Sequence, residues 1–312
     1  MTEVGVGQRA TAAGFALGWQ AGPVLGSRAA RAVFDGAADV GWRRGGPGVD
    51  RLRANLRRVV GPERSESDLD ALTRRGLRSY ARYFREVFWM PTAAPKVVAG
   101  RTRASGESTI AAIRAQGRGV VFALPHSGNW DAAAVAYGAR FGGPVTVVAE
   151  RLRPESLYRR FQSYRESLGM VVVPLTGGQR PLAGLLAATL RAGGTVCLLC
   201  ERDLSGSGVP VTFFGQTITV PPGPALLAVQ TGAALVPAVA GFDGDGWSLD
   251  YYPEVVVDRP NASKRLRDRV IQAMQEVVDQ FAVGIARAPQ DWHMMQPLWQ
   301  EDLQPVSTGS PR

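Results

Sequence analysis

The chain has 312 residues, of which 45% are hydrophobic and 20% charged, so it can bury a sizeable core and is not a disordered chain. Two cysteines and two histidines exclude a disulfide scaffold, a multi-cysteine zinc site and a histidine-rich metal site. The net charge of +9 predicts an anionic partner, which can be phospholipid headgroups, nucleic acid or a phosphorylated cofactor.

The positive charge is concentrated in residues 1–100, which hold 16 basic and 9 acidic side chains and so +7 of the total. Residues 1–8 have no basic segment ahead of an apolar run, and we therefore expect no secretory signal. The uncharged stretch Ala10–Ser27 is interrupted by four glycines and Pro23. These breaks argue against a membrane span.

Two helices are predicted in this first region, over Arg28–Trp42 and Leu69–Met90. The second has arginines on one face and aromatic side chains on another. Such a helix packs on a protein core or lies at the lipid–water boundary, with its arginines on phosphates, and both can hold at once. We expect residues 1–100 to form a helical region that faces the membrane.

From about residue 110, short apolar runs alternate with helical segments. We predict strands over Val120–Leu124, Val145–Ala149, Met170–Val173, Thr195–Cys200 and Leu235–Ala240. We predict helices over Ala132–Ala139, Ser156–Leu168, Leu182–Arg191, Ala225–Gln230 and Arg265–Ile285, and a β-hairpin segment over Trp247–Val257. This alternation predicts an α/β fold over residues 101–300, with a central, mostly parallel sheet flanked by helices. We expect a flexible tail over residues 304–312.

Polar residues follow three of the predicted strands, at their carboxyl ends. These segments are Pro125–Asp131, Glu150–Arg151 and Glu201–Asp203. Because ligands bind at the carboxyl edge of a parallel sheet, we expect the three segments to share one site.

His126 is the main candidate for chemistry, with Asp131 five residues later at the start of a helix. This spacing predicts that the Asp131 carboxylate accepts a hydrogen bond from one ring nitrogen and leaves the other free as a general base. The alternative is a histidine with a purely structural role in the core. No Gly-x-Ser-x-Gly motif is present, so we assign Ser127 to the turn.

The segment from His126 to Asp131 resembles the H-x4-D box of the glycerolipid and lipid A acyltransferases. Three later segments are similar to further blocks of that family: Phe213–Gly215, Thr219–Ala225 and Pro289–Trp299. The resemblance covers roughly residues 30–300. Within the family, the Arg-rich and Ala-rich character is most similar to the actinobacterial branch that acylates phosphatidylinositol mannosides.

The resemblance implies transfer of a fatty acyl chain of palmitoyl type from acyl-CoA, used as a substrate, to a sugar hydroxyl of that glycolipid. His126 would act as the base, Asp131 would stabilise its imidazolium, and Glu201 would be a supporting catalytic residue. It also implies a peripheral enzyme on an anionic membrane, at the cytoplasmic face of the plasma membrane, with no permanently bound cofactor and no metal.

Glu150, Arg165 and Arg202 are candidates for holding the acceptor, because carboxylates accept from sugar hydroxyls and guanidinium groups bind phosphodiesters. The alternative is that they form ordinary salt bridges. Cys197 and Cys200 lie three apart in a predicted strand and point to opposite faces, which argues against a dithiol or a metal site. His293, in an apolar segment, is explained by core packing or membrane contact.

Other functions stay open from the residues alone. The acceptor can be another lysophospholipid or glycolipid, and the protein can be a lipid-binding or nucleic-acid-binding protein without catalysis. The chain has no recognisable nucleic-acid-binding motif, and its paired glycines match neither a phosphate-binding loop nor a dinucleotide fingerprint. We therefore expect no nucleic-acid partner.

Overall fold

A computed structural model describes residues 17–21, 24, 27–178, 181–204, 206–257 and 265–303. The predicted flexible tail and most of the uncharged stretch Ala10–Ser27 lie outside these residues.

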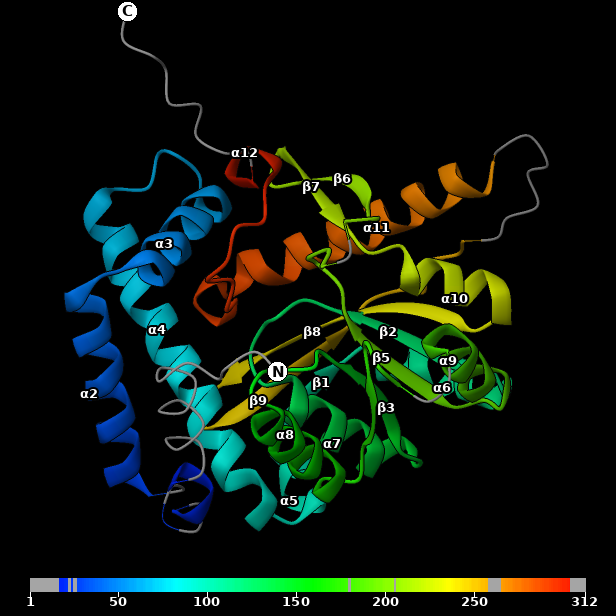
Figure 1. Cartoon of the computed structure of the whole chain (residues 1–312), viewed down its shortest axis with the longest axis horizontal. Coiled ribbons are helices and arrows are strands. Elements are labelled where there is room, and N and C mark those ends of the chain that lie inside the picture. The colour runs from blue at the N-terminus through cyan, green and yellow to red at the C-terminus, as the bar shows by residue number, and fades with distance from the viewer. Residues whose placement is uncertain are drawn as a thin grey trace, which may run out of the picture.

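The centre of the molecule is a seven-stranded sheet in the order β1-β9-β8-β2-β5-β3-β4 (Figure 1). Its strands are β1 (Thr102–Ser105), β2 (Val120–Leu124), β3 (Val145–Ala149), β4 (Val171–Pro174), β5 (Thr195–Leu199), β8 (Ala234–Asp243) and β9 (Gly246–Tyr251). All neighbours are parallel except the β8–β9 hairpin. The mostly parallel α/β sheet is confirmed.

Helices cover both faces of the sheet, with α11 on one side of the strands and α7 and α8 on the other in Figure 1. One face packs on α9 (Leu182–Arg191), α10 (Gly223–Thr231) and α11 (Leu266–Arg287). The other packs on α5 (Pro95–Gly100), α6 (Glu107–Ala115), α7 (Trp130–Phe141) and α8 (Glu155–Ser167). Cys200 belongs to the first core and Cys197 packs on the second, so the two thiols face opposite sides as predicted.

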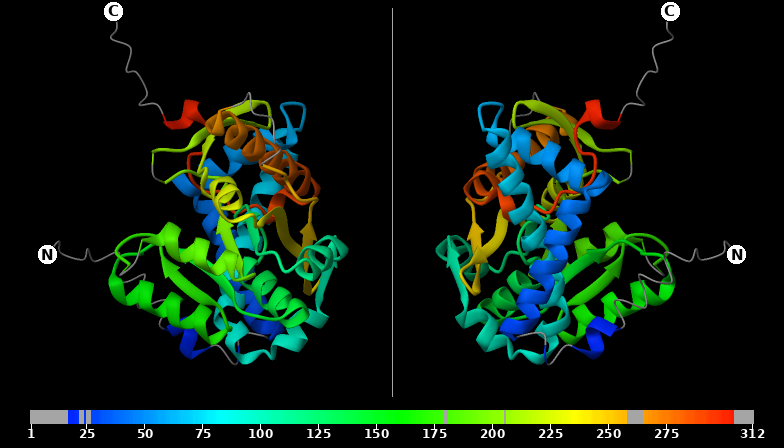
Figure 2. Two further views of the ribbon diagram at one scale, coloured as in Figure 1. Left: turned by 90° about the vertical axis from the view of Figure 1, so that its right-hand side faces the viewer. Right: turned by 90° about the vertical axis from the view of Figure 1, so that its left-hand side faces the viewer.

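The region before the sheet consists of α2 (Arg28–Arg44), α3 (Pro47–Val60) and α4 (Glu66–Trp89), followed by the short helix η2 (Met90–Thr92). The right-hand view of Figure 2 faces these helices. The first part of α4 packs with α3 through leucines, and its second part enters the sheet core through Tyr83, Val87 and Phe88. Tyr83 and Phe88 are thus buried in protein and do not reach lipid, while Tyr80, Phe84 and Trp89 pack half-buried against the same core. The prediction that α4 packs on the core is confirmed. No helix of the described residues is both long and apolar enough to cross a membrane.

The sequence prediction missed a β-hairpin, formed by β6 (Val209–Phe213) and β7 (Gln216–Val220). Its two turn residues, Phe214 and Gly215, have φ angles of 46° and 79°. Positive φ at both central positions is typical of a type I′ turn, which asparagine or glycine usually supplies. Phenylalanine at such a position conceals the turn in the sequence.

The segment after α11 runs back across the N-terminal helices, through η3 (Pro289–Asp291) to α12 (Gln300–Leu303). The fully buried Asn55 of α3 ties it down, because its Nδ2 donates to the carbonyl oxygens of Met294 and Gln296 at 2.8 and 3.1 Å. Trp292 and Trp299 of the same segment are also fully buried. The C-terminal segment is therefore held against α3.

We predict that Asn55→Ala lowers the free energy of unfolding by roughly 2 kcal/mol, because it leaves two backbone carbonyls without their donor. Urea denaturation of the full chain measures this change. Ser163→Ala removes an exposed polar group on α8 and is the control, expected to have little effect. Equal stability of the two variants would show that Asn55 does not hold the C-terminal segment.

Candidate active site

The register of β2 and β5 brings His126 and Glu201 together. In this parallel pair Leu124 lies opposite Leu199, and the Cys200 backbone N–H donates to the Leu124 carbonyl at 3.0 Å. His126 and Glu201 each stand two residues beyond the paired leucines, at the same edge of the sheet. The Glu201 Oε1 atom accepts from the His126 backbone N–H at 2.6 Å and lies 2.9 Å from the ring Nδ1.

This contact determines which ring nitrogen of His126 is available for chemistry. Burial raises the pKa of Glu201, but the charge of His126 and the hydrogen bonds from its ring and backbone outweigh burial and lower that pKa overall. An ionised carboxylate only accepts, so in the neutral ring Nδ1 carries the proton and Nε2 has the lone pair. Glu201 is fully buried, whereas the His126 side chain is 37% exposed. A basic nitrogen on a half-buried ring can therefore meet a substrate.

The loop after His126 depends on its glycine and its asparagine. Gly128 has φ of +58°, and a Cβ there would lie 2.6 Å from the backbone of Gly241, so a larger residue does not fit. The Asn129 side chain caps α7 by accepting from the Ala132 backbone N–H at 2.9 Å. These two residues set the position of α7 and so of Asp131 in its first turn.

Asp131 does not contact the His126 imidazole, and that part of the sequence prediction is wrong. Its carboxylate is buried and accepts from Arg165 Nε at 2.8 Å and from the Tyr83 hydroxyl at 3.2 Å. Although burial lowers the pKa of Arg165, Asp131 raises it overall, so the pair is ionised. Asp131 and Arg165 thus form a buried ion pair beside the His126 loop, while Glu201 contacts the imidazole.

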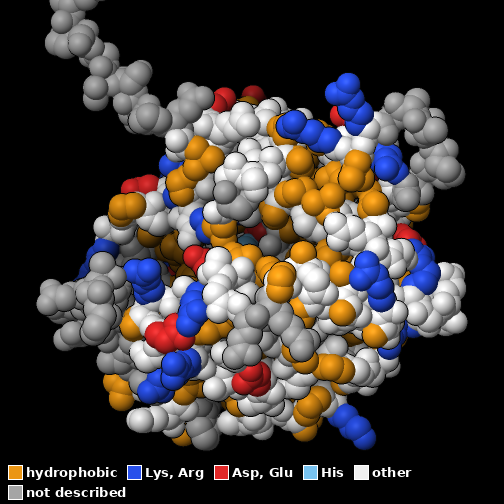
Figure 3. Space-filling model, turned by 45° about the vertical axis from the view of Figure 1, so that its right-hand side comes forward, with side chains coloured by type: hydrophobic (Ala, Val, Ile, Leu, Met, Phe, Trp, Pro, Cys, Tyr) orange, Lys and Arg blue, Asp and Glu red, His pale blue; other side chains and the backbone are white. Residues whose placement is uncertain are grey.

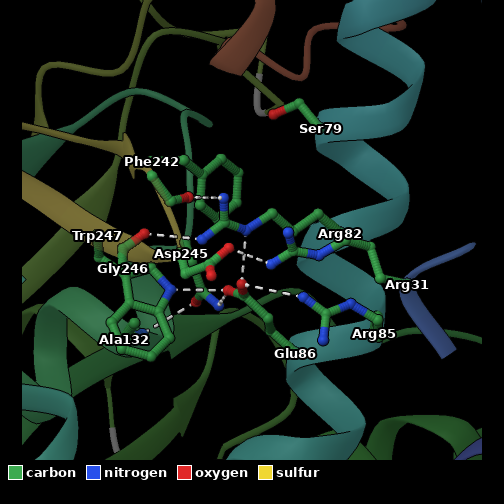
Figure 4. Close-up of polar contacts among 12 residues, drawn as sticks. Arg31, Ser79, Arg82, Arg85, Glu86, Ala132, Phe242, Asp245, Gly246 and Trp247 are labelled. Carbon is green, nitrogen blue, oxygen red and sulfur yellow. Dashed lines mark hydrogen bonds and ion pairs between the residues drawn. The ribbon is translucent and has the colours of Figure 1, made fainter. Parts of the chain in front are cut away.

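Three polar residues of α4 at positions i, i+4 and i+7 support this arrangement, and the sequence prediction missed all of them. They are Ser79, Tyr83 and Glu86. Glu86 is buried and accepts from Asn129 Nδ2 at 2.8 Å and from Trp247 Nε1 at 2.7 Å (Figure 4). Their helical spacing was the available signal, because it places polar groups on the buried face of an otherwise apolar stripe.

His293 lies against the site but is held as a core residue, as predicted. Its backbone N–H donates to the His126 carbonyl at 2.8 Å, and its Nε2 lies 3.0 Å from Ser79 Oγ. The same hydroxyl donates to Asp291. Burial, with a smaller contribution from His126, lowers the pKa of His293 to about 3. The ring is therefore neutral at neutral pH.

Glu150 and Arg202 lie at the same edge of the sheet as His126. Glu150 is exposed directly after β3, and Arg202 is half-buried beside Glu201. Neither side chain has a hydrogen bond or an ion pair with another described residue, so both can bind a ligand. Within the described part of the chain, no group of three or more His, Cys, Asp or Glu side chains is placed to hold a metal ion.

Comparison with known proteins points to one family. The family model described as bacterial lipid A biosynthesis acyltransferase matches residues 7–301. A phosphatidylinositol mannoside acyltransferase of Mycolicibacterium smegmatis is 45% identical, over 96% of this chain and 94% of that protein. A protein of the same name from Mycobacterium tuberculosis H37Rv is also 45% identical, over 96% of this chain and 91% of its own length.

We predict that His293 makes the fold sensitive to acid. Between pH 6.5 and about 3 the unfolded chain binds a proton on this residue that the folded chain does not, so stability falls as the pH falls. The contribution is at most about 1.4 kcal/mol per pH unit. In urea denaturation from pH 7 to pH 4, the stability of His293→Phe relative to wild type should therefore rise as the pH falls. A constant difference between the two proteins would contradict the assignment.

Proposed function

The chain belongs to the bacterial lipid A biosynthesis acyltransferase family, and from that premise we propose that it moves a fatty acyl chain from acyl-CoA to a sugar hydroxyl of a phosphatidylinositol mannoside. Membership makes it an acyltransferase of lipid biosynthesis. The glycolipid acceptor rests on two near-full-length relatives that carry the name phosphatidylinositol mannoside acyltransferase. The names of these relatives specify neither the acyl chain nor its donor, so the palmitoyl-type chain and the CoA donor are further parts of the proposal.

The observation that carries the mechanism is the contact between Glu201 and His126 Nδ1. With Nδ1 protonated, Nε2 takes the proton of the acceptor hydroxyl as its oxygen attacks the thioester carbonyl. The tetrahedral intermediate then expels the CoA thiolate, which receives the same proton from His126. The thioester is already activated, so the reaction needs no covalent enzyme intermediate.

Glu201 stabilises the imidazolium that forms in this step, because its buried carboxylate is already aligned with Nδ1–H. Asp131 acts indirectly, because it does not contact the imidazole. Its pairing with Arg165 and Tyr83 holds the first turn of α7, and with it the loop that carries His126. Arg165 is then a positioning residue more than a direct ligand of the acceptor.

Glu150 and Arg202 bind the acceptor in this proposal. They lie on one side of His126 along the sheet edge, Arg202 after β5 and Glu150 after β3, where a carboxylate accepts from sugar hydroxyls and a guanidinium donates to hydroxyl or phosphate oxygens. Figure 3 shows hydrophobic side chains gathered around a hollow on one face of the molecule, a lining that suits an acyl chain.

The enzyme works in this proposal as a peripheral protein on the cytoplasmic face of the plasma membrane, attached through its N-terminal helices. Helix α2 has no buried residue, although it is 17 residues long. Its exposed side carries small and apolar residues: Ala29, Ala32, Val33, Gly36, Ala37 and Val40. With arginines at both helix ends, this α2 strip suits an anionic bilayer surface.

We predict that His126→Ala and Glu201→Gln each lower acyl transfer by ~10²–10⁴-fold, because the first removes the base and the second the charge that stabilises it. Purified protein is incubated with palmitoyl-CoA and phosphatidylinositol mannoside, and free CoA and the mass of the product are measured. Cys197→Ala, on β5 but outside the site, is the control and should keep wild-type turnover. Near-normal transfer by a folded His126→Ala protein would exclude the mechanism.

We also predict that Val33→Glu weakens membrane attachment. A carboxylate in the middle of the α2 strip opposes both burial in the interface and the anionic surface. Co-sedimentation with phosphatidylinositol-containing liposomes should fall severalfold, and wild-type binding should weaken with salt. Val283→Glu makes the same change at an exposed valine of α11, 45% exposed against 68% for Val33, and is the control. Unchanged sedimentation of Val33→Glu would exclude α2 as the attachment surface.

A further inference from the structure

A polar cavity lies behind the H-x4-D box, between the start of α2, the end of α4 and the β8–β9 turn. Its volume is about 230 Å³, below the roughly 300–1,000 Å³ of pockets for drug-sized ligands. It can hold a compact polar group and has no room for an acyl chain. Figure 4 shows part of its wall, where Arg31 and Arg85 approach the carboxylates of Asp245 and Glu86.

The cavity has an excess of positive charge. Arg28, Arg31, Arg85 and Arg101 line it, against only two carboxylates, Glu86 and Asp245. Asp245 is engaged by Arg31, which is its ion-pair partner. Glu86 is engaged by Arg82 from one helical turn away, at 2.7 Å. Glu86 also pairs with Arg85 at 3.7 Å. Four guanidinium groups against two carboxylates still leave the lining with a net charge of +2, which favours an anion with more than one charged oxygen.

Arg28 is the residue that fold stability does not explain. It is the first residue of α2, where the helix dipole disfavours a cation, and no acidic residue shares that first turn. It is exposed and makes no ion pair or hydrogen bond with another described residue. The positive end of a 17-residue helix and an unpaired guanidinium thus meet at the mouth of the cavity.

The cavity is connected to the H-x4-D box through one of its lining residues, Glu86. Glu86 accepts from Asn129 Nδ2, and the same Asn129 caps the helix that carries Asp131. At its mouth the cavity adjoins the α2 strip, because Arg28 and Arg31 precede Val33 on the same helix. A group bound there would lie between the membrane-facing helix and the site of acyl transfer.

We propose that this cavity binds a phosphate group of one of the two substrates, either the phosphodiester of the acceptor lipid or a phosphate of acyl-CoA. The identity of these substrates rests on the proposed function, whereas the affinity of the cavity for phosphate does not. Arg165 is committed to the buried Asp131, which leaves Arg202 as the one guanidinium proposed to meet the acceptor, whereas the two substrates together carry several phosphate groups. The four arginines of the cavity bind one of these phosphates.

The test measures binding without turnover. Inositol 1-phosphate represents the acceptor headgroup and adenosine 3′,5′-bisphosphate represents the CoA phosphates, and calorimetry gives the affinity of the full chain for each. We expect one of them to bind, and Arg28→Glu to weaken that binding roughly tenfold or more. Arg75→Glu makes the same charge change on the exposed side of α4, and its affinity should equal that of wild type.

Steady-state kinetics then identify the substrate whose phosphate the cavity binds. Arg28→Glu should raise the KM of either the acceptor or acyl-CoA by a similar factor and leave kcat nearly unchanged. The substrate whose KM rises is the one whose phosphate binds in the cavity. Failure of both probes to bind wild type, or equal binding by Arg28→Glu, would overturn the proposal. If wild type transfers no acyl chain but the probe still binds and Arg28→Glu abolishes that binding, the proposed function fails and the phosphate site stands.

Discussion

The parallel pairing of β2 with β5 is the constraint on which the active site depends. It places a histidine and a glutamate two residues beyond paired leucines, so that one carboxylate oxygen meets both the backbone and the ring of His126. A shift of register by one residue would turn one of the two side chains to the other face of the sheet. The proposed base is therefore oriented by the ends of two paired strands at the centre of the fold.

Helix α4 connects this site to the rest of the molecule. Its buried polar residues contact three parts of the site in turn: Ser79 the C-terminal segment, Tyr83 the Asp131–Arg165 pair, and Glu86 the cap of α7. A buried charge is tolerated only when it is paired and hydrogen-bonded, and Glu86 and Asp131 each have an arginine partner. The N-terminal helices thus form one wall of the active site as well as the surface proposed to meet the membrane.

Periodicity in the sequence was enough to predict the parallel sheet, because each strand is a short apolar run between helical segments. It also predicted that His126 and Glu201 share an edge, since carboxyl ends of parallel strands meet there. It could not predict which carboxylate contacts the ring. Asp131 is nearer in sequence, but the geometry of the α7 start directs it to Arg165, and only the strand register reveals Glu201. The role of α4 was missed because the only signal was the helical spacing of three polar residues within an apolar stripe, which does not tell what they contact.

The protonation state of His126 tests the account most directly. In the full chain labelled with ¹⁵N-histidine, His126→Gln identifies the signals of this ring. In the neutral ring we expect a protonated Nδ1 and an Nε2 with a free lone pair, and Glu201→Gln should alter this pattern. A ring with its proton on Nε2 in the wild-type protein would contradict the assignment of Glu201 as its partner and of Nε2 as the base.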